Sequence, residues 1–245
     1  MATFVLVHGG WSGGWVWRAV SKELRRLGHD VYTPTLTGYG ERSHLLSPAV
    51  SLATFREDVL NVIRFEELLD VVLVAHSLNG PLAQDLASRQ PSVLTQLVLL
   101  DAFFVRPGER TVDAFEPVFA AATQAWVNAA GQGWLVPQLQ PDQDSIDATE
   151  GRGRHTAMPW KPYLEPVTVR ARLTTTLACT FILCTEKSTS PTDTAILASA
   201  QRAREDSWTL TEFRSGHVPM WTAPTELARL LADLTSERCG EDGRR

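Results

Sequence analysis

Residues 71–80, VVLVAHSLNG, decide the fold because they join an apolar run to a sharp turn with a serine at its apex. A short, continuous apolar run that ends in a turn is typical of a strand buried on both faces. A strand-to-helix turn that exposes a nucleophilic serine usually has glycine two residues before and two residues after it. Here those positions hold Ala75 and Asn79. The sequence therefore raises the question of whether Ser77 is still a nucleophile.

Short β-branched runs alternate with helical patterns on both sides of this stretch. The expected strands are residues 3–7, 30–33, 70–75, 94–101, 178–185 and 208–213. The expected helices are residues 16–27, 54–69, 81–89, 192–204 and 224–234. Near-continuous apolar strands separated by helices predict an α/β fold, with a mostly parallel sheet of about six strands covered by helices on both faces.

Residues 106–172 break this alternation, since no strong strand pattern appears and proline, tryptophan and small residues dominate. Within this interval 113–130 has a helical pattern, 138–154 has the composition of a polar loop, and 158–166 is too proline-rich for a regular element. We interpret the interval as a helical cap over the carboxyl ends of the strands, where open α/β sheets bind ligands. The core is then expected at 1–105 and 173–236, with a flexible tail at 237–245.

Composition excludes several classes of protein. The chain has 245 residues and a net charge of −5, which gives no basic field for nucleic acid or for an anionic membrane. Neither a targeting segment nor an apolar run of the ~20 residues that span a membrane is visible, so we expect a cytoplasmic protein. The three cysteines, Cys179, Cys184 and Cys239, lack zinc or redox spacing, and we expect neither metal nor cofactor. The oligomeric state is open, with a homodimer as one option.

Three short segments whose residues are suited to catalysis follow predicted strands and so meet at one edge of the sheet. Gly9 and Gly10 allow a tight backbone turn after the first strand, where main-chain N–H groups face a developing oxyanion. The N–H of Leu78 is the expected second donor, at the positive end of a helix. His217 follows the last strand, and an imidazole there takes the proton that makes the Ser77 hydroxyl nucleophilic.

These pieces, in this order, resemble the α/β-hydrolase superfamily over nearly the whole chain. The resemblance is carried by residues 4–17, 32–46, 75–80, 99–103 and 216–219. It is strongest to the branch that contains plant methylesterases, hydroxynitrile lyases and bacterial pyrethroid-type esterases. The resemblance implies a Ser77 nucleophile, a His217 base and an oxyanion hole at Gly10 and Leu78.

The departures from the elbow pattern are sterically mild. Alanine before the serine adds one methyl group, asparagine tolerates unusual backbone angles, and Gly80 relieves the contact between helix and strand. Ser77 is therefore the expected nucleophile, and the competing interpretation is a serine that only caps the helix. For His217 the competing interpretation is a surface loop histidine.

The acid that would support His217 is harder to assign. In the resembled family an aspartate follows the strand predicted at 178–185, but alignment on the loop proline places Lys187 there, and a lysine cannot accept from an imidazole N–H. Glu186 is one residue earlier, and Asp101 ends the strand after the elbow helix, where some lipases carry their acid. We favour Asp101 over Glu186 because a strand end is a rigid mount. A Ser–His dyad without an acid is a third option.

Aromatic residues near the predicted cap indicate a bulky apolar or aromatic substrate. We expect Trp11, Phe103, Trp126 and Trp160 to contact it. The sequence gives weaker indications for the remaining candidates, which are the packing histidines His8 and His76, the loop residues Arg42 and His44, and His155, which has no assigned partner.

Three functions stay open at this point. The first is an esterase that needs no cofactor and acts through Ser77 and His217. The second is a non-hydrolytic lyase, cyclase or isomerase that uses the same pair for acid–base chemistry on a polyketide-like molecule. The third is a binding protein for small molecules without catalytic activity. Burst release of alcohol from activated esters distinguishes the first from the others.

Overall fold

The computed structural model describes residues 1–138, 153–169 and 173–241. Its main sheet has six strands in the order β2-β1-β3-β4-β7-β8, and every neighbouring pair is parallel. The strands are β1 (Thr3–Val7), β2 (Asp30–Tyr32), β3 (Val71–His76), β4 (Leu94–Leu100), β7 (Ala178–Cys184) and β8 (Thr209–Phe213). The predicted α/β fold with a six-stranded parallel sheet is confirmed.

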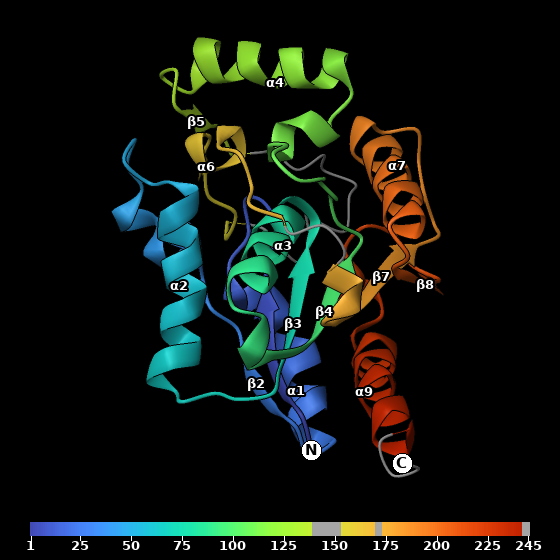
Figure 1. Ribbon diagram of the computed structural model, residues 1–245. Coiled ribbons are helices and arrows are strands. Elements are labelled where there is room, and N and C mark those ends of the chain that lie inside the picture. Colours follow the sequence, from blue (N-terminus) through green and yellow to red (C-terminus); the bar gives the residue numbers. More distant parts are fainter. Residues whose placement is uncertain (139–152, 170–172, 242–245) are drawn as a thin grey trace.

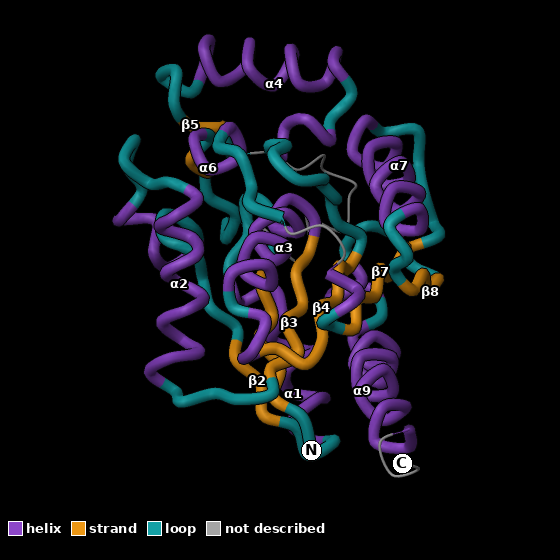
Figure 2. The backbone as a smooth tube through the Cα atoms, in the orientation of Figure 1, coloured by secondary structure: helices purple, strands orange, loops and turns teal. Residues whose placement is uncertain are grey.

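Helices cover both faces of this sheet (Figures 1 and 2). They are α1 (Arg18–Arg26), α2 (Leu52–Phe65), α3 (Gly80–Arg89), α7 (Pro191–Glu205), α8 (Pro219–Thr222) and α9 (Pro224–Glu241). Successive residues of a strand point to opposite faces. In β3, accordingly, Val71 and Leu73 pack with α2, α3 and α7, whereas Val72 and Val74 pack with α1 and α9. Burial on both faces explains why this strand has no polar alternation.

Helix boundaries follow local capping chemistry more closely than the apolar pattern predicted. Helix α2 begins at Leu52, two residues before the predicted start, because the Ser51 hydroxyl accepts a hydrogen bond from the N–H of Thr54 in a capping box. Helix α7 begins at Pro191 for the same reason, since Ser190 accepts from the N–H of Asp193. These caps fix the ends of the helices that flank the carboxyl edge of the sheet.

The described part of the segment between β4 and β7 lies over that edge (Figure 1). Its described elements are α4 (Pro117–Ala130), the antiparallel pair β5 (Leu135–Val136) and β6 (Met158–Pro159), and the one-turn helix α6 (Lys161–Leu164). The expectation that 158–166 holds no regular element is wrong, because β5 supplies a pairing partner and proline is tolerated in the first turn of a helix. Most of the loop expected at 138–154 falls outside the described residues.

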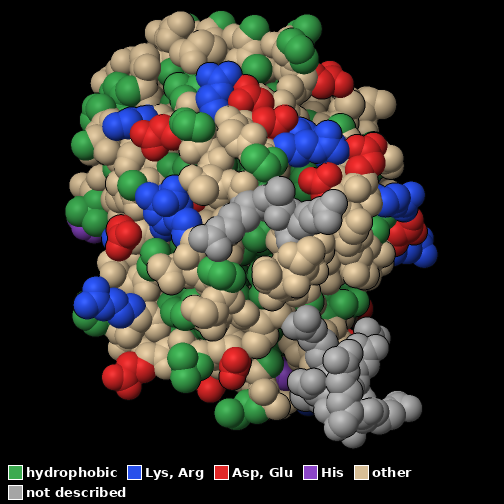
Figure 3. Space-filling view, in the orientation of Figure 1, with side chains coloured by type: hydrophobic (Ala, Val, Ile, Leu, Met, Phe, Trp, Pro, Cys, Tyr) green, Lys and Arg blue, Asp and Glu red, His purple; other side chains and the backbone are tan. Residues whose placement is uncertain are grey.

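Six stretches of 3₁₀ helix complete the described part of the chain. They are Gly14–Trp17, Gly40–Leu45, Ser77–Asn79, Pro91–Val93, Thr111–Ala114 and Leu173–Thr175. Helix α9 continues to Glu241, into the segment expected to be a tail. Within the described residues, no helix is both long and apolar enough to cross a membrane. On the face seen in Figure 3, basic and acidic side chains are interspersed.

Candidate active site

The turn after β3 holds Ser77 in a strained backbone conformation. Its φ of +55° lies in the left-handed region, which costs a residue with a side chain about 1–2 kcal/mol. The following helix then approaches the end of β4 so closely that a Cβ on Gly80 would lie 2.4 Å from the Phe103 carbonyl oxygen. The strain is therefore maintained by a tight crossing of helix and strand, as the sequence predicted from Gly80.

Asn79, the second departure from the elbow pattern, is fully buried and hydrogen-bonded. Its amide donates to the His8 carbonyl at 2.6 Å, and its amide oxygen accepts from the Tyr163 hydroxyl at 3.2 Å. The Tyr163 hydroxyl in turn lies 2.5 Å from that of Tyr39. Asn79 thus ties the elbow to the turn after β1 and to α6 of the cap, contacts that a glycine cannot make.

Ser77, His217 and Asp101 form a continuous chain of hydrogen bonds across three strand ends. His217 Nε2 lies 3.0 Å from Ser77 Oγ, and His217 Nδ1 lies 2.7 Å from Asp101 Oδ2. With Nδ1–H donating to the carboxylate, Nε2 is free to accept from the serine hydroxyl. His76 Nε2 donates to the His217 carbonyl at 2.8 Å and so fixes the loop that carries the imidazole. This is the geometry that proton transfer from a serine requires.

The two candidate acids lie in very different places. Asp101 is fully buried, and its Oδ1 accepts from the N–H of Cys184 at 2.9 Å. Glu186 has a side chain that is 58% exposed and pairs with Arg214 at 3.3 Å. The structure thus brings Asp101, and not Glu186, to His217. Glu186 points away because it follows β7 on a loop whose inward position is taken by Lys187.

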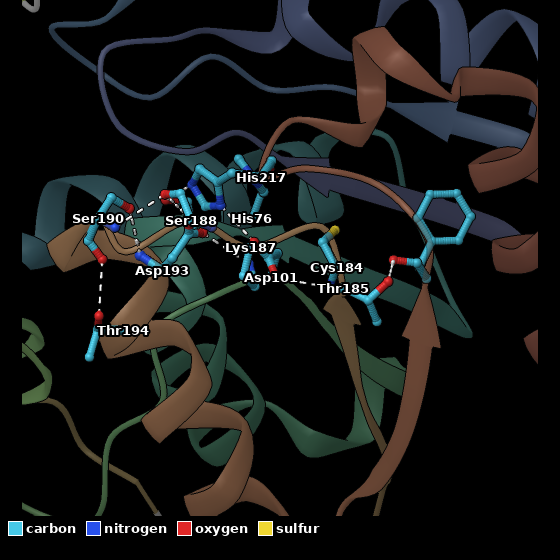
Figure 4. A network of polar contacts seen from close by, with 12 residues as sticks. His76, Asp101, Cys184, Thr185, Lys187, Ser188, Ser190, Asp193, Thr194 and His217 are labelled. Atoms are coloured by element: carbon cyan, nitrogen blue, oxygen red, sulfur yellow. Dashed lines mark hydrogen bonds and ion pairs between the residues drawn. The ribbon is translucent and has the colours of Figure 1, made fainter.

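Lys187 contacts the same carboxylate as the imidazole. Its Nζ lies 2.5 Å from Asp101 Oδ2 and 3.3 Å from Asp193 Oδ1, with only 9% of the side chain exposed (Figure 4). The sequence placed a lysine at the usual acid position but did not predict this ion pair. The local signal was the basic residue itself, which in a buried position requires a carboxylate partner.

The histidines that precede the site are held neutral by burial. Burial lowers the pKa of His8 to about 4, against the smaller opposite effect of its hydrogen bond to the Gly9 carbonyl. Burial also lowers the pKa of His76 well below its usual value, and the neighbouring His217 adds to this effect. Both therefore serve packing and backbone contacts, as the sequence indicated.

A cavity of about 490 Å³ opens above Ser77 and His217. Besides Ser77 and His217, six of the predicted site residues line it, namely Gly10, Leu78, Trp11, Phe103, Trp126 and Trp160. The sequence did not assign a further group of lining residues, which are Phe115, Val136, Met158, Ser190, Thr192 and Asp193. Several of these come from short elements whose direction depends on the packing of the cap. The walls are mostly apolar and aromatic, which favours a ligand of the same kind.

The loop candidates separate into structural and cavity residues. Arg42 pairs with Asp58 at 2.8 Å and does not line the cavity, and His44 is exposed. His155 lines the cavity and lies edge-on to Trp15 and Trp221, with ring centroids 5.6 and 5.9 Å apart. The cavity lining therefore includes the imidazole of His155 from the cap as well as His76 and His217.

Comparison with known proteins identifies the family of the chain. The model of the alpha/beta hydrolase family matches residues 4–230, and the chain belongs to this family. A carbendazim hydrolyzing esterase from Nocardioides sp. (strain SG-4G) is 49% identical over 109 residues, which are 44% of this chain and 45% of that protein. Methylesterase 9 of Arabidopsis thaliana is 33% identical over 125 residues, covering 51% and 49%. The chain thus spans about half the length of these curated relatives.

Among solved structures, an extracellular alpha/beta-hydrolase from a Paenibacillus species superimposes with a TM-score of 0.81. It covers 95% of this chain and 98% of its own, at 23% identity. At this identity the likeness establishes the fold alone. The resemblance to the branch that includes plant methylesterases is confirmed by the family match and by these relatives.

Proposed function

We propose that the protein is an esterase that hydrolyses carboxylic esters through Ser77. The observation that carries the proposal is the 3.0 Å contact between Ser77 Oγ and His217 Nε2 at the base of an apolar cavity. The buried carboxylate of Asp101 on the other ring nitrogen supports a hydrolase over a binding protein, since it stabilises the imidazolium that forms during proton transfer. The names of the relatives, an esterase and a methylesterase, support the same activity.

In the proposed reaction Ser77 Oγ bonds to the ester carbonyl carbon while its proton passes to His217 Nε2. The N–H groups of Gly10 and Leu78 hold the resulting oxyanion. The bond to the alcohol oxygen then breaks, and this oxygen leaves with the proton from His217. Water, deprotonated by His217, attacks the acyl carbon and releases the acid, and Ser77 recovers its proton.

The substrate class follows from the cavity. Trp126 and Trp160 contribute aromatic surface from the cap, and Phe103 contributes it from the loop after β4. We infer a substrate with an aromatic or bulky apolar group that lies against these rings, joined to a small alcohol. Carbendazim, named for one relative, and methyl esters of aromatic acids are the compounds to test first.

The test measures p-nitrophenol release from p-nitrophenyl acetate on a millisecond timescale. We expect a burst equal to the enzyme concentration, and Ser77→Ala should lose the burst and at least about 10³-fold of kcat/KM. Ser88→Ala is the matched control, because this buried serine lies in α3 with its hydroxyl on the Gln84 carbonyl, away from the cavity.

Two other results would contradict the proposal. If Ser77→Ala keeps turnover while His217→Ala loses it, the pair performs base chemistry of a non-hydrolytic enzyme. If the wild-type protein binds aromatic esters without any turnover, it is a binding protein.

A further inference from the structure

The Asp101 carboxylate carries two cationic or potentially cationic donors on one oxygen. His217 Nδ1 lies 2.7 Å from Oδ2, and Lys187 Nζ lies 2.5 Å from the same atom, while Oδ1 is occupied by the N–H of Cys184. Because Asp101 is fully buried and Lys187 nearly so, solvent screens these charges weakly. A change in the charge at Lys187 must therefore change the electrostatic environment of the His217 imidazole.

Lys187 also forms an ion pair with a second carboxylate, that of Asp193. Asp193, in the first turn of α7, lies 3.3 Å from Lys187 Nζ and accepts hydrogen bonds from the N–H and the hydroxyl of Ser188 at 2.8 and 2.6 Å. Burial alone would raise the pKa of Asp193, but the Ser188 hydrogen bonds and the Lys187 charge outweigh it and hold that pKa below its usual value. Asp193 is thus ionised at neutral pH, and it draws part of the lysine's charge away from Asp101 (Figure 4).

We propose that Lys187 is a positioning residue, and that the Lys187–Asp193 pair sets how tightly His217 holds the proton that it takes from Ser77. The inference rests on the proposed esterase function. A carboxylate that is shared with a lysine stabilises the imidazolium less than an unshared one does. Asp193 opposes the lysine, so the two residues act on His217 in opposite directions.

Other ionisable groups also lie around His217. These groups are His8 after β1, His76 at the end of β3, Cys184 at the end of β7, Glu186 after β7 with its partner Arg214 after β8, and His155 from the cap. Burial keeps His8 and His76 neutral and raises the pKa of the Cys184 thiol, so none of the three changes charge near neutral pH. Glu186 and Arg214 are exposed, so solvent screens their effect.

The experiment records kcat/KM for p-nitrophenyl acetate against pH in the wild type, Lys187→Met and Asp193→Asn. Removing the cation frees Asp101 to stabilise protonated His217, so the ascending limb should move to higher pH by roughly one unit in Lys187→Met. When the Asp193 charge is removed, the lysine interacts with Asp101 alone. The ascending limb should therefore move to lower pH by roughly half a unit in Asp193→Asn. Lys187→Arg retains the charge and should stay close to the wild type.

The matched control is Arg56→Met. Arg56 pairs with the fully buried Asp85 at 2.8 Å, and Asp85 also pairs with Arg89. When Arg56 is replaced, Asp85 therefore keeps one partner, as Asp101 keeps His217 when Lys187 is replaced. This variant removes a comparable ion pair away from the cavity, and its limb should not move. If Lys187→Met does not fold, the inference is tested with Asp193→Asn and the double variant Lys187→Met/Asp193→Asn. The ascending limb of the double variant should lie at higher pH than that of the wild type.

Shifts of the ascending limb in opposite directions in Lys187→Met and Asp193→Asn support the inference. A purely structural role would lower the activity of both variants without shifting their ascending limbs in opposite directions. The inference is overturned if both limbs stay in place, if both move in the same direction, or if Arg56→Met moves as far as Lys187→Met. Failure of the proposed function is a separate result: there the wild type shows no turnover that depends on Ser77. The inference alone fails when the Ser77-dependent burst is intact and the limbs do not respond.

Discussion

The neighbouring ends of β4 and β7 lie side by side and contribute opposite charges to one site. Asp101 follows β4 with a φ of +44°, and its N–H donates to the Ile182 carbonyl of β7 at 2.8 Å. The chain after β7 instead sends Glu186 outward and Lys187 inward. Both strand ends are within reach of His217, but only the end of β4 supplies a carboxylate. In this chain, therefore, the carboxylate that contacts the imidazole comes from the end of β4, and the end of β7 supplies a cation that contacts the same carboxylate.

The largest effect that tests this comparison is on catalysis. Asp101→Asn removes the charge that stabilises the imidazolium and allows the wrong tautomer of His217, so kcat/KM should fall by about 10³- to 10⁴-fold. Glu186→Gln, the matched change at the neighbouring strand end, should stay within about twofold of the wild type. Steady-state kinetics with an activated ester measures both. Equal, mild losses in the two variants would mean that Ser77 and His217 act as a dyad.

A smaller effect concerns stability at low pH, which depends on the buried histidines at the ends of β1 and β3. His8 takes up a proton near pH 6.5 in the unfolded chain but, because it is buried, only near pH 4 in the folded protein. The unfolded state therefore binds more protons in this window, and stability is lost as the pH falls through it. His76, with its pKa also lowered, acts in the same direction.

Denaturant unfolding at pH 7 and at pH 4.5 measures this loss. His8 alone should lower the free energy of unfolding by about 2 kcal/mol between these two pH values. His8→Gln should reduce the difference between the two pH values, and His44→Gln, at an exposed position, should leave it unchanged. A free energy of unfolding that is flat between the two pH values would contradict the assignment of buried, neutral histidines.

The smallest effect sharpens the contrast between the two carboxylates. The side chains of Glu186 and Arg214 are 58% and 90% exposed, and ion pairs in such positions contribute little. Arg214→Ala should change the free energy of unfolding by less than about 0.5 kcal/mol and leave kcat/KM unaltered. A large loss of activity in this variant would show that the exposed pair influences His217 and that the end of β7 shapes the acid site through Glu186.

The sequence predicted the features that depend on local pattern and chain order. The six strands, the elbow at Ser77 and the loop carrying His217 follow from apolar runs and turns, and the ends of parallel strands must share an edge. The choice of Asp101 over Glu186 rested on the rigidity of a strand end, and the geometry agrees with it. Local reasoning fails where the contact partner is distant in the chain. From the sequence, Asn79 is expected only to tolerate the turn, but in the structure it forms hydrogen bonds with His8 and with Tyr163 of the cap.

The Lys187 contacts were beyond prediction for a related reason. They depend on which side chain of a short loop turns inward, and this is set by the packing of α7 against β7 and not by the loop sequence alone. In the cap, the two-residue strand β6 exists because β5 pairs with it, and no periodicity can be read from so short a run.

In the proposed reaction Ser77 attacks the substrate and carries its acyl group. Intact-protein and peptide mass spectrometry after rapid mixing with a slowly released p-nitrophenyl carbamate tests it most directly. We expect one carbamoyl group per chain, on the peptide that contains Ser77, and no adduct in Ser77→Ala. Release of p-nitrophenol without any adduct on Ser77, or an adduct on a different residue, would contradict it.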